Sequence, residues 1–197
     1  MTRARSTFGL IFLMTTALAI GPSSPTSARA IAESSLCALS YLPSEIQSHL
    51  KRDFGSWRVQ EPADLGRYAR ARWEGKKPLE CPGIAVGKFE NGKMPSYAVL
   101  LVPQGHANAG YRFLVFSPQS GQPSYEMRVV DQSDKGGAAN FFIHKASISK
   151  FFDERSRTKF DARTSEGILL VDAAENEYGV EVYFWSGGNY RHEPIDY

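Results

Sequence analysis

The sequence predicts an α+β fold, namely a largely antiparallel sheet of about eight strands with two N-terminal helices packed on it and one disulfide. Helical spacing of apolar residues occurs early in the chain, before residue 75. Short apolar runs bounded by Gly, Pro, Ser and Asn dominate the rest, which is typical of antiparallel strands. Two cysteines, Cys37 and Cys81, supply the disulfide.

The N-terminus has the pattern of a secretory signal peptide. Arg3 and Arg5 precede an apolar run from Phe8 to Ile20, and a small-residue site follows at Ala28-Arg29-Ala30. The apolar run is shorter than the roughly 20 residues that span a bilayer, although a retained anchor is the open alternative. We therefore expect residues 1–30 to be a signal peptide and residues 31–197 to form a single globular domain, periplasmic or secreted, without stable membrane insertion after cleavage.

The charge balance gives no support for an anionic partner. The precursor carries 23 Lys and Arg against 21 Asp and Glu. Removal of Arg3, Arg5 and Arg29 with the signal turns this small excess of positive charge into a small excess of negative charge. Nucleic-acid binding depends on clustered positive charge, so we expect no nucleic-acid partner.

The two cysteines belong to a chain expected to enter an oxidising compartment. One structural disulfide between Cys37 and Cys81 closes a loop of about 45 residues and contributes about 3–4 kcal/mol by the loop-entropy argument. Free thiols or metal ligands are the alternatives. Neither is supported by a Cys-x-x-Cys spacing or a neighbouring histidine.

Two helices are expected before the sheet. Pro43-Ser44-Glu45 begins the first, Ile46, Leu50 and Phe54 form its apolar stripe, and Gly55 ends it. A short strand follows over Ser56–Gln60. The second helix runs from about Pro62 to Trp73 and carries Arg67, Arg70 and Arg72 on its polar side. That side is either a solvated face or a docking patch for an acidic partner.

The stretch from Cys81 to Pro103 predicts the centre of the sheet. It contains half of the disulfide, a strand, a tight polar turn and a second strand. The run Tyr97–Val102 is continuously apolar and lies between Pro95-Ser96 and Pro103, as expected of a strand buried on both faces.

Further strands are expected along the remainder of the chain, and Asp153–Ser165 is left unassigned. The runs at Ile168–Val171 and Val180–Trp185 form a hairpin around the acidic turn 173–177. The expected strands after Pro103 are Tyr111–Phe116, Tyr125–Val130, Asn140–Ile143, Ile148–Phe152, Ile168–Val171, Val180–Trp185 and Tyr190–His192.

Residues Gly87–Val102, with the Cys81-Pro82-Gly83 lead-in, resemble a single FG-GAP-like repeat of the kind found in integrin-type propellers and in small exported bacterial proteins. Phe89, Gly92, Pro95 and Tyr97-Ala98 fit that pattern. The resemblance implies a rigid strand-turn-strand. The family's calcium-binding positions are here occupied by Lys88, Glu90, Gly92 and Ser96, and a lysine repels a cation, so the shape is expected without the ion.

No cofactor or metal is expected elsewhere. The acidic turn with Asp172, Glu175, Asn176 and Glu177 could hold a divalent ion, but it lacks the order of an EF-hand loop. A solvated hairpin turn is the simpler interpretation.

Catalytic motifs are not evident in the sequence. There is no Gly-x-Ser-x-Gly, and the four histidines, His49, His106, His144 and His192, are interpreted as surface residues. Carboxylates for glycosidase chemistry could still converge from different strands. The candidates are Glu126, Asp131, Glu181 and Glu193.

The C-terminal hairpin offers a candidate binding surface. Alternation places Tyr183 and Trp185 on one face of a strand and Val182 and Phe184 on the other. If the valine face is core, Tyr183, Trp185 and Tyr190 form an exposed aromatic surface beside Arg191, a composition typical of binding hot spots. The alternative is that both faces are covered.

These observations favour a non-enzymatic exported domain that binds a protein or a cell-envelope glycan, with an inhibitor or immunity-type protein as one concrete form. The alternative is a small periplasmic hydrolase whose carboxylates are brought together by the sheet. An exposed Trp185 surface would favour binding, and a pocket with paired acids would favour the enzyme.

Overall fold

The computed structural model describes residues 37–76, 80–90, 94–106, 108–122, 124–152 and 165–195. The predicted signal peptide lies outside these residues. None of the helices in the described part of the chain combines the length and the apolar character needed to cross a bilayer.

The first sheet, sheet A, is antiparallel and has the strand order β1-β3-β4-β5. Strand β2 also pairs with β3, on the same edge as β1 but farther along. The strands are β1 (Trp57–Val59), β2 (Ile84–Gly87), β3 (Ser96–Pro103), β4 (Tyr111–Pro118) and β5 (Tyr125–Ser133).

The second sheet, sheet B, is an antiparallel meander in the order β6-β7-β8-β9. Its strands are β6 (Phe141–Ser147), β7 (Glu166–Ala173), β8 (Tyr178–Ser186) and β9 (Asn189–Pro194). Short 3-10 turns connect the elements at η1 (Leu39–Tyr41), η2 (Pro62–Asp64), η3 (Ala138–Asn140) and η4 (Ile148–Lys150).

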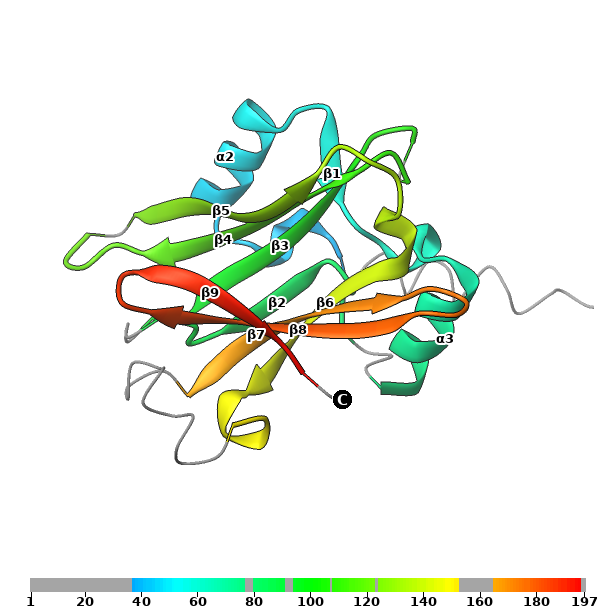
Figure 1. Ribbon diagram of the computed structural model, residues 1–197. Coiled ribbons are helices and arrows are strands. Elements are labelled where there is room, and N and C mark those ends of the chain that lie inside the picture. Colours follow the sequence, from blue (N-terminus) through cyan, green and yellow to red (C-terminus); the bar gives the residue numbers. More distant parts are fainter. Residues whose placement is uncertain are drawn as a thin grey trace, which may run out of the picture.

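The two sheets face each other, and each has a helix on its outer face. Helix α2 (Ser44–Asp53) packs on sheet A through Ile46 and Leu50, and α3 (Arg67–Lys76) packs on sheet B through Ala69 and Trp73. The order of layers is therefore helix, sheet, sheet, helix, with α2 and α3 on opposite sides of the molecule (Figure 1).

The core between the sheets follows from strand alternation. Strand β3 directs Ala98, Leu100 and Val102 toward sheet B, and it directs Val99 and Leu101 toward α2. Both sets are almost completely buried, which explains why the strand is apolar at every position.

A disulfide joins Cys37 to Cys81, with their Cα atoms 5.0 Å apart. Gly83, which follows it, lies so close to β1 that a Cβ there would come within 2.5 Å of the Gln60 carbonyl oxygen. The Cys-Pro-Gly sequence thus brings the start of β2 against the end of β1. The disulfide holds the segment before α2, which begins at Cys37, at the same place.

The fold class expected from the sequence is confirmed: two N-terminal helices, antiparallel sheets that total nine strands among the described residues, and the disulfide Cys37–Cys81. The strands divide into two facing sheets. The expected strand at Ile148–Phe152 is wrong, because Ile148–Lys150 forms a 3-10 turn. Most of Asp153–Ser165 lies outside the described residues.

Candidate functional site

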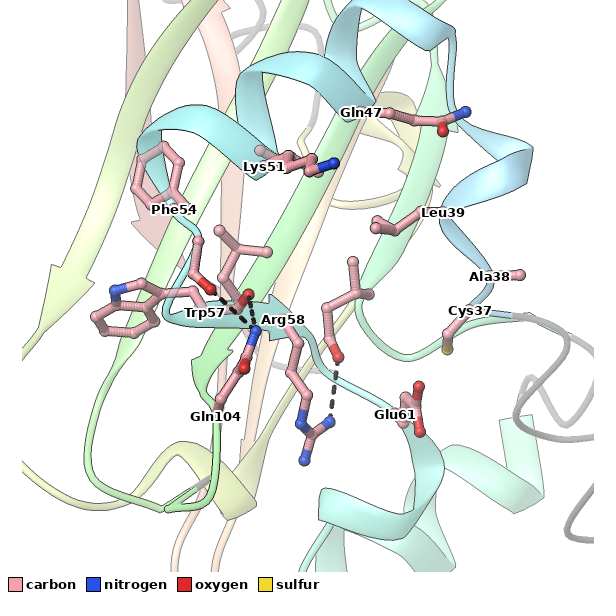
Figure 2. Close-up of a pocket in the computed structure, with 14 residues that line it drawn as sticks. Cys37, Ala38, Leu39, Gln47, Lys51, Phe54, Trp57, Arg58, Glu61 and Gln104 are labelled. Carbon is pink, nitrogen blue, oxygen red and sulfur yellow. Dashed lines mark hydrogen bonds between the residues drawn. The ribbon is translucent and has the colours of Figure 1, made fainter.

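A groove of about 410 Å³ opens between α2 and the edge strand β1. Helix α2 forms one wall with Gln47, Leu50 and Lys51, and Phe54 extends this wall directly after the helix. The other sides come from the η1 end of the chain, from β1 and from the loop after β3, as Figure 2 shows. The remaining lining residues are Cys37, Ala38, Leu39, Gly55, Trp57, Arg58, Val59, Glu61, Leu101 and Gln104.

The floor of the groove is apolar and rigid. Leu50, Val59 and Leu101 line it while belonging to the core cluster under α2, and each is at most 5% exposed. Leu39 lies at the rim and is 43% exposed, and the neighbouring Tyr41 is 64% exposed. Large exposed apolar side chains beside an apolar hollow are typical of interaction sites.

Local hydrogen bonds fix the rim on the β1 side. The Gln104 side chain donates to the carbonyl oxygens of Gly55 (3.1 Å) and Trp57 (3.4 Å), as Figure 2 shows. The Trp57 ring is covered by the Arg112 guanidinium at 4.5 Å from its centroid. The loop between α2 and β1 is therefore held in place before any partner arrives.

The charges around the groove differ in how they are engaged. Arg58 forms a two-pronged ion pair with Asp64, whose side chain is 8% exposed. Lys51 is exposed and forms no ion pair with any residue that the structure describes. Lys51 is thus the cation available to a partner, and Glu61 contributes the opposite charge to the lining.

The C-terminal residues singled out in the sequence lie elsewhere, along the side where the two sheets end in β5 and β9. Tyr183 is 2% exposed and belongs to the core between the sheets. Of the two interpretations left open by the sequence, the one in which both faces of the strand are covered therefore holds at Tyr183, and an exposed aromatic surface does not include this residue. Its face of β8 packs against sheet A through contacts such as Phe113 (5.0 Å between ring centroids), while the opposite face packs on α3.

Trp185, Tyr190 and Arg191 lie at that side of the sandwich and differ in exposure and in their contacts. Trp185 is half-buried, with the Tyr190 ring 5.2 Å and the Arg128 guanidinium 4.7 Å from its ring. Tyr190 is half-buried, and burial followed by the charge of Glu90 raises the pKa of its hydroxyl. Arg191 is exposed.

A second hollow, of about 420 Å³, lies beside these residues, between β5 and β9. Its lining residues are Arg128, Val129, Val130, Asn189 and Tyr190. Arg128 is committed to ion pairs with Glu90 (3.0 Å) and Glu126 (2.7 Å). Fewer residues line this hollow than line the groove under α2, and its lining is more polar.

Two of the four acids named from the sequence converge at the same side. The Tyr183 hydroxyl lies 3.1 Å from Asp131 Oδ2 and 3.1 Å from Glu181 Oε2. The Tyr111 hydroxyl donates to the same Asp131 oxygen at 2.7 Å, and His192 Nδ1 lies 2.9 Å from Glu181 Oε2. Asp131 Oδ2 and Glu181 Oε2 therefore lie close together, because both are within 3.1 Å of the same Tyr183 hydroxyl.

The other two acids do not join them. Glu126 pairs with Arg128, and Glu193 lies opposite Val182 in the β8–β9 register, on the face of sheet B that is turned away from sheet A. Burial, together with the charges of Asp131 and Glu181, raises the pKa of Tyr183, so its hydroxyl stays protonated between the carboxylates.

The acidic turn lies between β7 and β8. Asp172 is half-buried, Glu175 accepts a hydrogen bond from the Tyr68 hydroxyl at 2.8 Å, and Glu177 is exposed. Among the residues that the structure describes, no group of three or more His, Cys, Asp or Glu is arranged to hold a metal ion. His144 corrects another expectation, because it is 4% exposed rather than at the surface.

The stretch that resembles an FG-GAP-like repeat forms an antiparallel pair, β2 with β3, and Phe89 is fully buried between the sheets. Gly92 lies outside the described residues. Comparison with protein families, with curated proteins and with solved structures finds no match to this chain.

Sequence reasoning missed the groove under α2. No site was predicted from the sequence for the segment before Pro43 or for Lys51. The usable signal was Leu39 and Tyr41, two large apolar residues close to Cys37 and outside any periodic element.

Proposed function

We propose that this chain is an exported, non-enzymatic binding domain that takes a partner protein of the cell envelope at the groove between α2 and β1. The observation that carries the proposal is a hollow floored by the buried apolar residues Leu50, Val59 and Leu101 and bordered by the exposed Leu39. An inhibitor or immunity-type protein that acts on an envelope hydrolase would have these properties.

The groove suits a protein partner because its apolar floor is already assembled. The disulfide and the Gln104 hydrogen bonds hold the walls, so binding costs little ordering of this surface. An apolar side chain of the partner inserted over Leu50 and Val59 would leave water, with a gain of about 25 cal/mol per Å² of its own apolar surface, and it would also cover the exposed Leu39. The disulfide also agrees with an oxidising compartment.

A photoreactive benzophenone amino acid at position 39 tests the proposal. The control carries the same group at Met94, which is 49% exposed against 43% for Leu39. We expect an envelope protein to crosslink from position 39 and not from position 94. Binding of that purified protein should be lost in Leu39→Asp and kept in Met94→Asp. Equal crosslinking from both positions, or none from position 39, would refute the proposed site.

A second candidate function is supported by the convergence of Asp131 and Glu181. Retaining glycosidases place two carboxyl groups about 5–5.5 Å apart, and here both acids share the Tyr183 hydroxyl. A periplasmic hydrolase of glycans would use them as acid and nucleophile.

The enzyme alternative is tested by release of soluble fragments from purified cell-wall glycan. Turnover by the wild-type protein, lost by at least about a hundredfold in both Asp131→Asn and Glu181→Gln, would support it. Glu126→Gln is the matched control, because Glu126 pairs with Arg128 outside this cluster. Absence of turnover by the wild-type protein would rule it out.

A further inference from the structure

We infer that the groove receives an extended segment of the partner, which adds to sheet A as a strand alongside β1. This inference rests on the proposed function and specifies how the partner is held. Its basis is the edge position of β1, the backbone groups that β1 turns outward, and the exposed Lys51 on the helix wall of the groove.

Strand β1 pairs with a neighbour on one side only. Its register against β3 places Arg58 opposite Val102. The flanking bonds, Gln104 N–H to the Ser56 oxygen and Gln60 N–H to the Leu100 oxygen, show that residues 56, 58 and 60 face β3. In an antiparallel pair the residues between them turn their N–H and C=O groups away. Trp57 and Val59 therefore face outward.

The groove reaches this backbone edge. Trp57, Arg58 and Val59 all line it, although successive side chains of a strand point to opposite faces. A hollow lined by three consecutive strand residues reaches the edge of the sheet as well as the face under α2.

The outward groups of β1 are unequally satisfied. The Trp57 N–H donates to the Phe54 oxygen at 2.8 Å, and the Trp57 oxygen accepts from Gln104 at 3.4 Å. The Val59 oxygen receives only a long contact of 3.4 Å from Arg58, and within the described residues the Val59 N–H has no acceptor. An edge residue that turns its N–H and C=O outward can pair with an added strand, and a residue of that strand supplies both an acceptor and a donor at this position.

The same geometry specifies the side chains of the segment. Along an extended segment alternate side chains share one face, so one of them would lie over the floor of Leu50, Val59 and Leu101. Lys51 stands on the helix wall and has no carboxylate partner among the described residues. The segment is therefore expected to present an apolar residue to the floor and an acidic residue to Lys51.

The test uses seven-residue peptides displayed on phage and selected on the purified protein. We expect enrichment of an apolar residue and an Asp or Glu two to three positions away. The best peptide is then synthesised with one amide N-methylated at a time. Strand addition predicts that an N-methyl group on the one amide opposite Val59 weakens binding at least about tenfold while those on its two neighbours do not, because neighbouring amides of a paired strand point the other way.

Two protein variants complete the test. Lys51→Glu should weaken the acidic peptide by about three- to tenfold, whereas Lys135→Glu, at the exposed turn after β5, should not. Binding that is lost in Leu39→Asp but indifferent to N-methylation overturns strand addition and leaves the groove as the binding site. If neither N-methylation nor Leu39→Asp changes the affinity for the peptide, the proposed site is overturned as well. A selection that yields no binding peptide has the same consequence.

Discussion

Asp172 is a half-buried acid whose charge has little compensation. Its Oδ1 atom is buried and has no hydrogen-bond partner among the described residues. Burial, and then the charge of Glu177, raises the pKa of Asp172 above its usual 3.8. The folded state therefore holds this proton more tightly than the unfolded chain does.

The raised pKa of Asp172 gives a pH prediction. Between 3.8 and the higher folded-state pKa, the folded protein binds more protons than the unfolded chain, so this group's contribution to stability falls as the pH rises. Asp172→Asn should therefore be more stable than wild type at pH 7 and equal to it below pH 3.8, as measured by urea denaturation. A variant less stable at pH 7 would show that the carboxylate is stabilising.

Gln60 is the polar residue on which both sheets depend. It is 0% exposed, and its side-chain amide donates to the carbonyl oxygens of Ala138 (3.0 Å) and Phe141 (2.8 Å) at the start of sheet B. No local pattern distinguishes Gln60 in the sequence, because its partners lie about 80 residues away and only the packed sheets bring them together.

Replacing Gln60 should expose that dependence. Gln60→Met keeps most of the volume but removes the two side-chain hydrogen bonds, although the Ala138 oxygen keeps the Phe141 N–H as a donor. The expected cost is about 1–3 kcal/mol in the free energy of unfolding. Gln132→Ala, at an exposed position of β5, is the control and should change it by less than about 0.5 kcal/mol. An unchanged denaturation midpoint for Gln60→Met would contradict this role.

At the scale of elements, the disulfide connects the segment before α2 to the start of β2, which pairs with the interior strand β3 of sheet A. The two cysteines are 44 residues apart in the sequence, and both are part of the hydrophobic cluster between α2 and sheet A. Cys37 also lines the groove. The disulfide therefore contributes both to stability and to the shape of the site.

Reduction should lower the free energy of unfolding by about 3–4 kcal/mol. The thermal midpoint with and without reducing agent measures this. Because Cys37 forms part of the groove wall, the reduced protein should also bind its partner more weakly at temperatures where it remains folded. A midpoint insensitive to reducing agent would show that the bond contributes nothing to the fold.

The β8–β9 hairpin shows which features of a strand its sequence periodicity can predict. Alternation correctly assigned Val182 and Phe184 to one face of the strand and Tyr183 and Trp185 to the other. It could not show that a second sheet covers the tyrosine face, because that depends on contacts between distant strands. The helix at Ser44–Asp53 and the strand Ser96–Pro103 were predictable, since their patterns are local and strong.

Trp185 is consequently expected to contribute to stability. Its ring is held between Arg128 and Tyr190, so Trp185→Ala should lower the free energy of unfolding by about 1–3 kcal/mol. Arg191→Ala, at an exposed position of the same hairpin, should leave it nearly unchanged. Equal melting curves for wild type and Trp185→Ala would instead indicate an aromatic ring available to a partner.

At the scale of the whole molecule, the two sides of the sandwich differ in how their polar groups are used. Along β5 and β9, tyrosines, acids and Arg128 are already bonded to one another. Under α2, an apolar floor, an outward backbone donor and an available lysine remain open. This contrast could not be predicted from the sequence, because each side combines elements from distant parts of the chain.

The account's central claim, that a partner binds between α2 and β1, is tested most directly by backbone amide chemical shifts of the ¹⁵N-labelled protein during titration with the partner captured from position 39. We predict that the largest changes occur at Lys51, Trp57 and Val59, with Asn189 and Tyr190 unaffected. Changes concentrated at Asn189 and Tyr190, with α2 and β1 silent, would contradict it.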